Sequence, residues 1–137
     1  MRAVVLDNEA VQSLLDPRHR KHRLVLAHLE AVATRRRKGA DVTALVPTSV
    51  RVEAGWDRTA PAAAPVNRLG IKDVALDTRH ADAAAAIARA YPDVGVVDAH
   101  LGAAVQAHEA TEIVVLTSDP GDLHRVVDPL DVTIVRV

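Results

Sequence analysis

The chain has 137 residues, of which 49% are hydrophobic and 26% are charged, with 17 basic and 18 acidic side chains. This length predicts one domain over residues 1–137, with a single hydrophobic core. The absence of cysteine excludes disulfides and thiolate zinc sites. Only two aromatic residues occur, Trp56 and Tyr91, so base stacking on aromatic platforms is not expected. No segment resembles a signal peptide or a transmembrane helix, and we expect a cytoplasmic protein without membrane contact.

The apolar pattern predicts strands that alternate with helices along the whole chain. Short β-branched or apolar runs predict five strands, at 2–6, 43–46, 73–76, 113–117 and 132–135. Helices are predicted between them, at 8–15, 17–38, 49–58, 78–90, 98–109 and 120–127. The proline-containing stretch 59–70 is predicted to be a loop. This alternation favours an α/β fold of three layers, α/β/α, with a central, mainly parallel five-stranded sheet.

Four acidic residues stand near the ends of the predicted strands or in the helices that follow them. Asp7 follows the first strand, Glu53 lies in the helix after the second, Asp98 begins a helix, and Asp119 follows the fourth strand. In an open α/β sheet the chemistry collects outside the carboxyl ends of the strands. The sequence therefore predicts that these carboxylates meet at one edge of the sheet.

The setting of Glu53 favours a functional role for these acids. Glu53 lies three residues after Val50 and three before Trp56, which on a helix predicts that it shares their apolar face. Burying several carboxylates without partners is costly, so we expect a shared counter-charge. Oxygen ligands without cysteine suit Mg²⁺ or Mn²⁺ better than zinc.

Each acid also has a purely structural alternative. Asp98 has the position of a helix N-cap, and Asp119 with Pro120 is a common pairing of a cap with a first helical residue. Taken together, with Glu53 predicted to face inward, the four acids favour a metal site over four separate caps.

Four short motifs follow one another along the chain: Leu6-Asp7, Pro-Thr-Ser-Val-Arg-Val-Glu53, Val97-Asp98-Ala-His-Leu-Gly and Leu116-Thr117-Ser118-Asp119-Pro-Gly-Asp122. Through these motifs the chain resembles a PIN domain over essentially its whole length, and more narrowly the VapC-type toxins of bacterial toxin–antitoxin pairs. The resemblance implies a PIN-like fold and a metal-dependent endoribonuclease that hydrolyses RNA phosphodiester bonds. It also implies a homodimer and a cognate antitoxin that holds the enzyme inactive.

The same resemblance implies roles for individual residues. The catalytic residues and ligands of Mg²⁺ or Mn²⁺ would be Asp7, Glu53, Asp98 and Asp119. Thr117 would be a polar support and Asp122 a peripheral acid. Asn8 departs from the serine or threonine that often follows the first acid, and it would also be a supporting residue. His100 stands where a hydrophobic residue is commoner.

Basic residues concentrate in one segment of the chain. Residues 18–38 hold eight of the 17 basic side chains: Arg18, Arg20, Lys21, Arg23, Arg35, Arg36, Arg37 and Lys38. They are either the solvated ends of a helix or a surface for phosphates or an acidic partner. The residues expected to contact RNA or a partner protein are Arg18, Arg20, Lys21 and Arg23.

The main alternative is a PIN-like fold kept as a catalytically silent RNA- or protein-binding module. Loss of an acid would indicate such a module, and all four are present. A phosphotransfer domain would carry Asp-x-Asp where this chain has Asp7-Asn8-Glu9, and a receiver domain would carry a lysine after a late strand, whereas Lys72 is the last lysine. No metal-binding histidine spacing is present. Gly102 is predicted to be a close-packing point.

Overall fold

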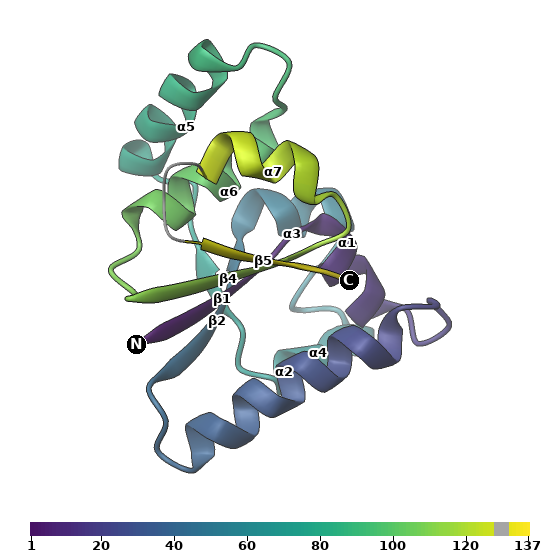
Figure 1. The fold of residues 1–137 in the computed structure, drawn as a ribbon. Helices are drawn as coiled ribbons and strands as arrows, with labels where there is room; N and C mark the ends of the chain where they lie inside the picture. Colours follow the sequence, from purple (N-terminus) through teal and green to yellow (C-terminus); the bar gives the residue numbers. More distant parts are fainter. Residues whose placement is uncertain (128–131) are drawn as a thin grey trace.

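A five-stranded parallel sheet forms the centre of the molecule (Figure 1). The computed structural model describes residues 1–127 and 132–137, apart from the side chain of residue 122. The strands are β1 (Arg2–Leu6), β2 (Val42–Pro47), β3 (Lys72–Val74), β4 (Glu112–Thr117) and β5 (Val132–Arg136). Their order across the sheet is β3-β2-β1-β4-β5, and each neighbouring pair is parallel. All five predicted strands are confirmed, with small differences at their ends.

Helices cover both faces of this sheet, which confirms the predicted three layers. They are α1 (Asn8–Leu15), α2 (His22–Arg37), α3 (Thr48–Ala54), α4 (Ala64–Asn67), α5 (Thr78–Ala90), α6 (Val96–Ala107) and α7 (Pro120–Val127), with a short 3₁₀ helix at Pro61–Ala63. Figure 1 shows α2 across one face of the sheet and α6 and α7 across the other, with α5 packed outside α6. No helix in the described part of the chain is both long enough and apolar enough to cross a membrane.

Strand β1 lies at the middle of the sheet and contributes to a core on each face. Val4 and Leu6 pack with α1 and α2, whereas Ala3 and Val5 pack with α5, α6 and α7. All four are buried, because successive side chains of a strand point to opposite faces and both faces are covered here. A strand buried on both faces reads as a continuous apolar run, which is why the sequence predicted a parallel sheet.

The second helix begins later than the sequence predicted. The sequence predicts a start at Pro17, but α2 starts at His22 and residues 17–21 form turns. The carboxylate of Asp16 accepts a hydrogen bond from the backbone N–H of Arg18 at 3.0 Å. An aspartate that bonds the backbone two residues ahead stabilises a turn in competition with a helix. The basic residues that follow therefore lie on a loop.

Helix α3 is shorter than predicted, because it ends at Ala54 and not near residue 58. Gly55 has a φ of +73°, a left-handed conformation that glycine adopts without steric cost and that stops a helix. The predicted loop 59–70 is also partly helical, since it contains the 3₁₀ helix and α4.

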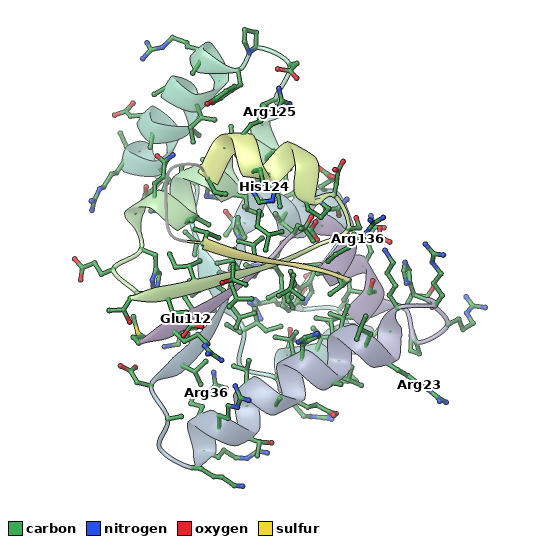
Figure 2. All side chains as sticks on the ribbon, viewed as in Figure 1. Arg23, Arg36, Glu112, His124, Arg125 and Arg136 are labelled. Atoms are coloured by element: carbon green, nitrogen blue, oxygen red, sulfur yellow. The ribbon has the colours of Figure 1, made fainter. Side chains whose placement is uncertain are left out.

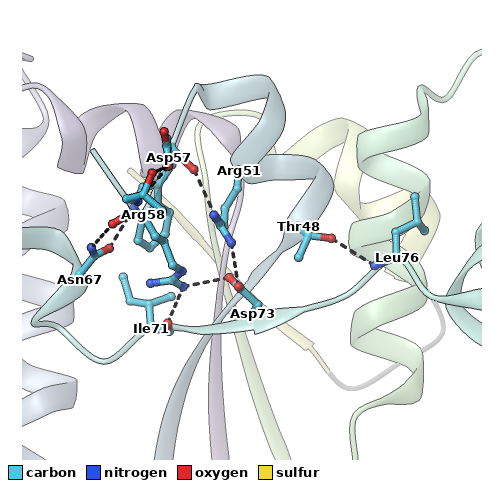
Figure 3. A network of polar contacts seen from close by, with 10 residues as sticks. Thr48, Arg51, Asp57, Arg58, Asn67, Ile71, Asp73 and Leu76 are labelled. Atoms are coloured by element: carbon cyan, nitrogen blue, oxygen red, sulfur yellow. Dashed lines mark hydrogen bonds and ion pairs between the residues drawn. The ribbon is translucent and has the colours of Figure 1, made fainter. Parts of the chain in front are cut away.

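A polar network fastens the segment after α3 to the edge of the sheet (Figure 3). The guanidinium groups of Arg51 and Arg58 both contact the carboxylate of Asp73, at 2.7 and 2.9 Å. The indole N–H of Trp56 donates to the side-chain oxygen of Asn67 at 3.3 Å. Both guanidinium groups also lie over the Trp56 ring, at 5.6 and 4.2 Å from its centroid. The network fixes the end of α3 and so the position of the residues that α3 carries.

The prediction for Gly102 is confirmed. A Cβ atom at this position of α6 would lie 3.1 Å from Cδ1 of Ile87 in α5 and 3.1 Å from Cβ of Val126 in α7. Glycine therefore allows three helices to approach closely on this face of the sheet.

Candidate active site

Asp7 stands where β1 ends and α1 begins. Its carboxylate caps α1 by accepting a hydrogen bond from the N–H of Ala10 at 2.9 Å. The hydroxyl of Thr117 and the N–H of Ser118 also donate to it. Burial raises the pKa of Asp7 above its usual range, and Glu9 adds to this effect, whereas the three hydrogen bonds oppose it. This side chain is a carboxylate whose negative charge is disfavoured by its surroundings.

Asp119 lies at the same edge of the sheet as Asp7, because the strands that precede them are neighbours. Strand β4 pairs with β1, and the N–H of Asp7 donates to the carbonyl of Leu116 at 3.1 Å. The Thr117 hydroxyl accepts a hydrogen bond from the N–H of Asp119 at 3.0 Å while it donates to Asp7. Asp119 is exposed and directly precedes Pro120, the first residue of α7. The buried Thr117 thus links both acids.

The prediction that Glu53 faces the core is wrong. Glu53 is exposed, whereas Val50 and Trp56 are buried. The prediction required the helix to continue to Trp56, but the left-handed Gly55 ends it first. Glu53 lies in the last turn of α3, on a side that faces solvent.

Glu53 is instead joined to the first acid motif through Asn8. The side-chain amide of Asn8 donates to Oε1 of Glu53 at 2.7 Å, and its Oδ1 accepts a hydrogen bond from Gln12 at 3.2 Å. Asn8 is the residue that immediately follows Asp7, so this contact brings Glu53 to the same edge of the sheet. An amide at position 8 can donate to the carboxylate and accept at the same time.

Asp98 lies in the first turn of α6. The helix begins at Val96, and Gly95 is its N-cap, so the alternative in which Asp98 caps the helix is wrong. An acidic side chain in the first turn is stabilised by the partial positive charge of the helix N-terminus. Val97 of the same turn lines a hollow of about 440 Å³ together with Glu53. The beginning of α6 therefore lies beside the end of α3.

A hydrogen bond that the sequence analysis did not foresee ties these two helices together. Oγ of Ser49 in α3 lies 2.7 Å from Nδ1 of His100 in α6. Ser49 precedes Glu53 by one helical turn, and His100 lies two residues after Asp98. His100 is fully buried, and burial lowers its pKa, which favours the neutral ring. Its departure from the hydrophobic residue common at this position was the only signal in the sequence.

The four acids thus come from four elements that meet at the carboxyl ends of β1, β2 and β4, a region called here the carboxyl edge. Within the described residues, no three of Asp, Glu, His or Cys are close enough to form a ready metal-binding group. No lysine or arginine in the described part of the chain forms an ion pair with Asp7, Glu53 or Asp119. The side chain of Asp122, the predicted peripheral acid, lies outside the described residues.

The donor set at the carboxyl edge fits a hard divalent cation by its chemistry. All four groups offer carboxylate oxygens, which Mg²⁺ and Mn²⁺ prefer. The raised pKa of Asp7 identifies a carboxylate that a nearby cation would stabilise in its charged form. The residues present are therefore compatible with the predicted ion.

Of the predicted RNA or partner contacts, Arg18, Arg20 and Lys21 lie on the loop between α1 and α2, and Arg23 lies in the first turn of α2. Arg18, Arg20 and Arg23 are exposed, and Lys21 is partly buried. Lys21 contacts the carboxylate of Glu9, in the first turn of α1, at 3.7 Å.

Comparison with known proteins supports the fold but gives no sequence relative. No protein-family model matches the chain, and no curated protein matches its sequence. The structure is similar to a chain in the crystal structure of VapBC2 from Rickettsia felis bound to a DNA fragment from their promoter. The TM-score is 0.62, the sequence identity is 10%, and the match covers 98% of each chain. The likeness therefore extends over the complete fold, and the predicted PIN-like fold class is confirmed.

Proposed function

We propose that this protein is a metal-dependent endoribonuclease and the toxin of a toxin–antitoxin pair. One observation carries the proposal: Asp7 and Asp119 end adjacent parallel strands, and the buried hydroxyl of Thr117 joins them. Acidic residues at the carboxyl ends of parallel strands occupy the place where α/β folds carry their chemistry. The similarity in fold to a chain of the VapBC2 structure supports the same assignment.

In this proposal the ligands of Mg²⁺ or Mn²⁺ are Asp7, Glu53, Asp98 and Asp119. When bound, such an ion neutralises phosphate charge and lowers the pKa of water. The protein's own contribution is positioning. Thr117 holds Asp7 and the backbone of Asp119, and Asn8 holds Glu53. The Ser49–His100 hydrogen bond fixes the helices that carry Glu53 and Asp98.

The proposal also includes the partners of such a toxin. The structure with the similar fold is a VapBC2 assembly bound to promoter DNA. By analogy, this chain would bind a cognate antitoxin and form a homodimer, with RNA as its substrate. Size-exclusion chromatography with light scattering, with and without a protein encoded beside it, tests the assembly.

The decisive experiment is cleavage of RNA by the purified protein and by the variant Asp98→Asn. Cleavage of a labelled single-stranded RNA is measured with Mg²⁺ or Mn²⁺ and again with a chelator. We expect cleavage only with metal. Cleavage should decrease by about 100-fold or more in Asp98→Asn, because the substitution removes a negatively charged ligand of the proposed metal ion. Full activity of Asp98→Asn would overturn the assignment.

The matched control is Asp93→Asn, five residues earlier in the chain. Asp93 forms an exposed ion pair with Arg125 at 2.8 Å, outside the carboxyl edge. Loss of such a solvent-exposed pair has little effect on stability, so cleavage should be unchanged. A decrease in both variants would indicate a general effect of the substitutions on folding.

The binding-module alternative is distinguished by the effect of metal on thermal stability. An ion that binds only the folded state stabilises it by about 2.7 kcal/mol at 100 times its Kd. Cleavage that depends on both metal and Asp98 supports the nuclease. Absence of cleavage together with an unchanged melting temperature in Mg²⁺ and Mn²⁺ favours the silent module.

A further inference from the structure

The basic residues of segment 18–38 separate into two clusters at opposite ends of α2. Figure 2 shows Arg23 at one end of this helix and Arg36 at the other. The first cluster lies on residues 16–23, which comprise the turn before α2 and the first two residues of that helix and are called here the basic loop. The second, called the far cluster, consists of Arg35, Arg37 and Lys38. Arg23 lies in the first turn of this 16-residue helix and Arg35 in its last, so their backbones are about 18 Å apart along the helix axis. The two clusters therefore face different ends of the sheet.

The basic loop is fastened beside the acids of the carboxyl edge. Glu9 lies in the first turn of α1, two residues after Asp7. Nε2 of His19 lies 3.2 Å from Oε1 of Glu9, and Nζ of Lys21 lies 3.7 Å from the same oxygen. The N–H of Lys21 also donates to Nδ1 of His19 at 3.1 Å. These contacts hold the loop against the helix that Asp7 caps.

Three arginines of this loop extend into solvent. The side chain of Arg18 is 94% exposed, and Arg20 and Arg23 are also exposed. A further cation, Arg136, is exposed in β5 and pairs in register with Thr117 of β4. Figure 2 shows Arg136 and Arg23 toward the same end of the molecule. Positive charge thus borders the carboxylates at this end.

We infer that the basic loop binds the phosphodiester backbone of the RNA substrate and brings it to the carboxyl edge, an inference that rests on the proposed function. A phosphate that approaches four carboxylates is repelled unless cations compensate. Arginine guanidinium groups bind phosphate through paired, charge-assisted hydrogen bonds. The loop segment from Pro17 to Arg23 has no apolar side chain other than the proline, whereas the core of a protein interface is depleted in charge.

The aromatic residues do not offer an alternative mode of binding. Trp56 is 3% exposed and is covered by the guanidinium group of Arg58. Tyr91 lies beside Arg125, whose guanidinium carbon is 5.9 Å from the ring centroid. Without stacking platforms, binding depends on phosphate contacts and should weaken strongly with salt.

The test compares two triple variants that remove equal positive charge. Arg18→Ala/Arg20→Ala/Arg23→Ala changes the basic loop, and Arg35→Ala/Arg37→Ala/Lys38→Ala changes the far cluster, in which all three residues are exposed. Arg36 is left in place because it bonds the carbonyls of Leu69 and Gly70. Binding of a fluorescein-labelled single-stranded RNA is followed by anisotropy in chelator over a range of salt concentrations, with RNA integrity checked on a gel.

We expect the loop variant to bind RNA roughly tenfold or more weakly at low salt. Its salt slope should fall by about 2, since each lost phosphate contact on a single strand contributes about 0.7. The far-cluster variant should bind like the wild type. Equal losses in both variants, or wild-type binding by the loop variant, would overturn the inference.

This outcome is separable from the outcome for the proposed function. Binding that depends on the loop, without metal-dependent cleavage, would leave the inference standing and reject the nuclease. Cleavage that depends on Asp98 but not on the loop arginines would support the nuclease and reject the loop. Circular dichroism of both variants verifies that they fold.

Discussion

The acidic side chains at the two ends of the sheet have different partners. At the amino ends of the strands, the acids Glu112 and Asp41 are paired with cations of the chain: Arg2 pairs with Glu112 at 2.8 Å, and the N-terminal ammonium group lies 3.7 Å from Asp41. At the carboxyl edge, Asp7 and Glu53 are held by neutral donors, namely a hydroxyl, an amide and backbone N–H groups. The negative charges of Glu112 and Asp41 are thus offset by ion pairs, whereas the described contacts of Asp7 and Glu53 leave their negative charge in place.

This difference separates a structural role from a functional one. Exposed ion pairs contribute little to stability, and replacing them has small effects. A half-buried carboxylate with a raised pKa, such as Asp7, lowers the stability of the folded state at neutral pH. Such groups collect at functional sites. The carboxyl edge is therefore where substitutions should change activity, and the amino end is where they should not.

The largest effect is expected for Asp7→Asn. Asparagine is an equally good N-cap, so α1 should remain intact. Cleavage should decrease by about 100-fold or more, because the amide does not supply the lost charge. The melting temperature without metal should stay the same or rise by a few degrees, because a disfavoured charge is removed. Retention of wild-type cleavage, measured with labelled RNA in Mg²⁺, would contradict the role given to Asp7.

A smaller effect is expected for Asn8→Ala, which removes the amide that donates to Glu53. Loss of a residue that orients a metal ligand typically costs 10- to 100-fold in metal affinity or activity. Titration of cleavage with Mg²⁺ should show a weaker apparent affinity, with little change in melting temperature. Gln12 donates to the oxygen of the Asn8 amide and not to Glu53, so Gln12→Ala is the control. It should lose less metal affinity than Asn8→Ala. Equal metal affinity in Asn8→Ala and the wild type would show that the contact is not needed.

The pH dependence of stability isolates the charge of Asp7. Its pKa in the folded protein is raised above the ordinary value of 3.8, so the folded state binds this proton more tightly than the unfolded chain. The resulting stability is fully present below pH 3.8 and is lost as the pH rises through the folded pKa. Without metal, the melting temperature of Asp7→Asn should therefore rise relative to that of the wild type as the pH increases from 3.8 through the folded pKa of Asp7. Added Mg²⁺ should reduce the difference, and parallel curves for the two proteins would disprove the sign.

The smallest effect is expected at the amino end. The side chains of Arg2 and Glu112 are 40% and 50% exposed. A double-mutant cycle with Arg2→Ala and Glu112→Ala should give a coupling energy below about 1 kcal/mol, measured by urea unfolding. RNA cleavage should be unchanged in both. A decrease in cleavage comparable with that of Asp7→Asn would remove the distinction between the two ends of the sheet.

Much of the fold follows from local patterns that the sequence contains. The continuous apolar run 3–6 requires cover on both faces of β1, and the helices between strands require parallel crossovers. The positions of Asp7 and Asp119 at strand ends follow directly, because the carboxyl ends of neighbouring parallel strands meet at one edge. These features depend on residues that are close together in the chain.

The contacts that assemble the rest of the site were decided by the tertiary structure. Glu53 meets Asn8 across 45 residues of sequence, and Ser49 meets His100 across 51. The spacing of Val50, Glu53 and Trp56 predicted a buried Glu53 only on the assumption that the helix continues past Gly55, and it does not. The sequence alone determined which residues are acidic and which strands precede them. The packing of α1, α3 and α6 determined which side chains these residues contact. A hydrogen bond between distant segments depends on the positions of whole helices, and it produces no periodic pattern in the sequence from which it could be predicted.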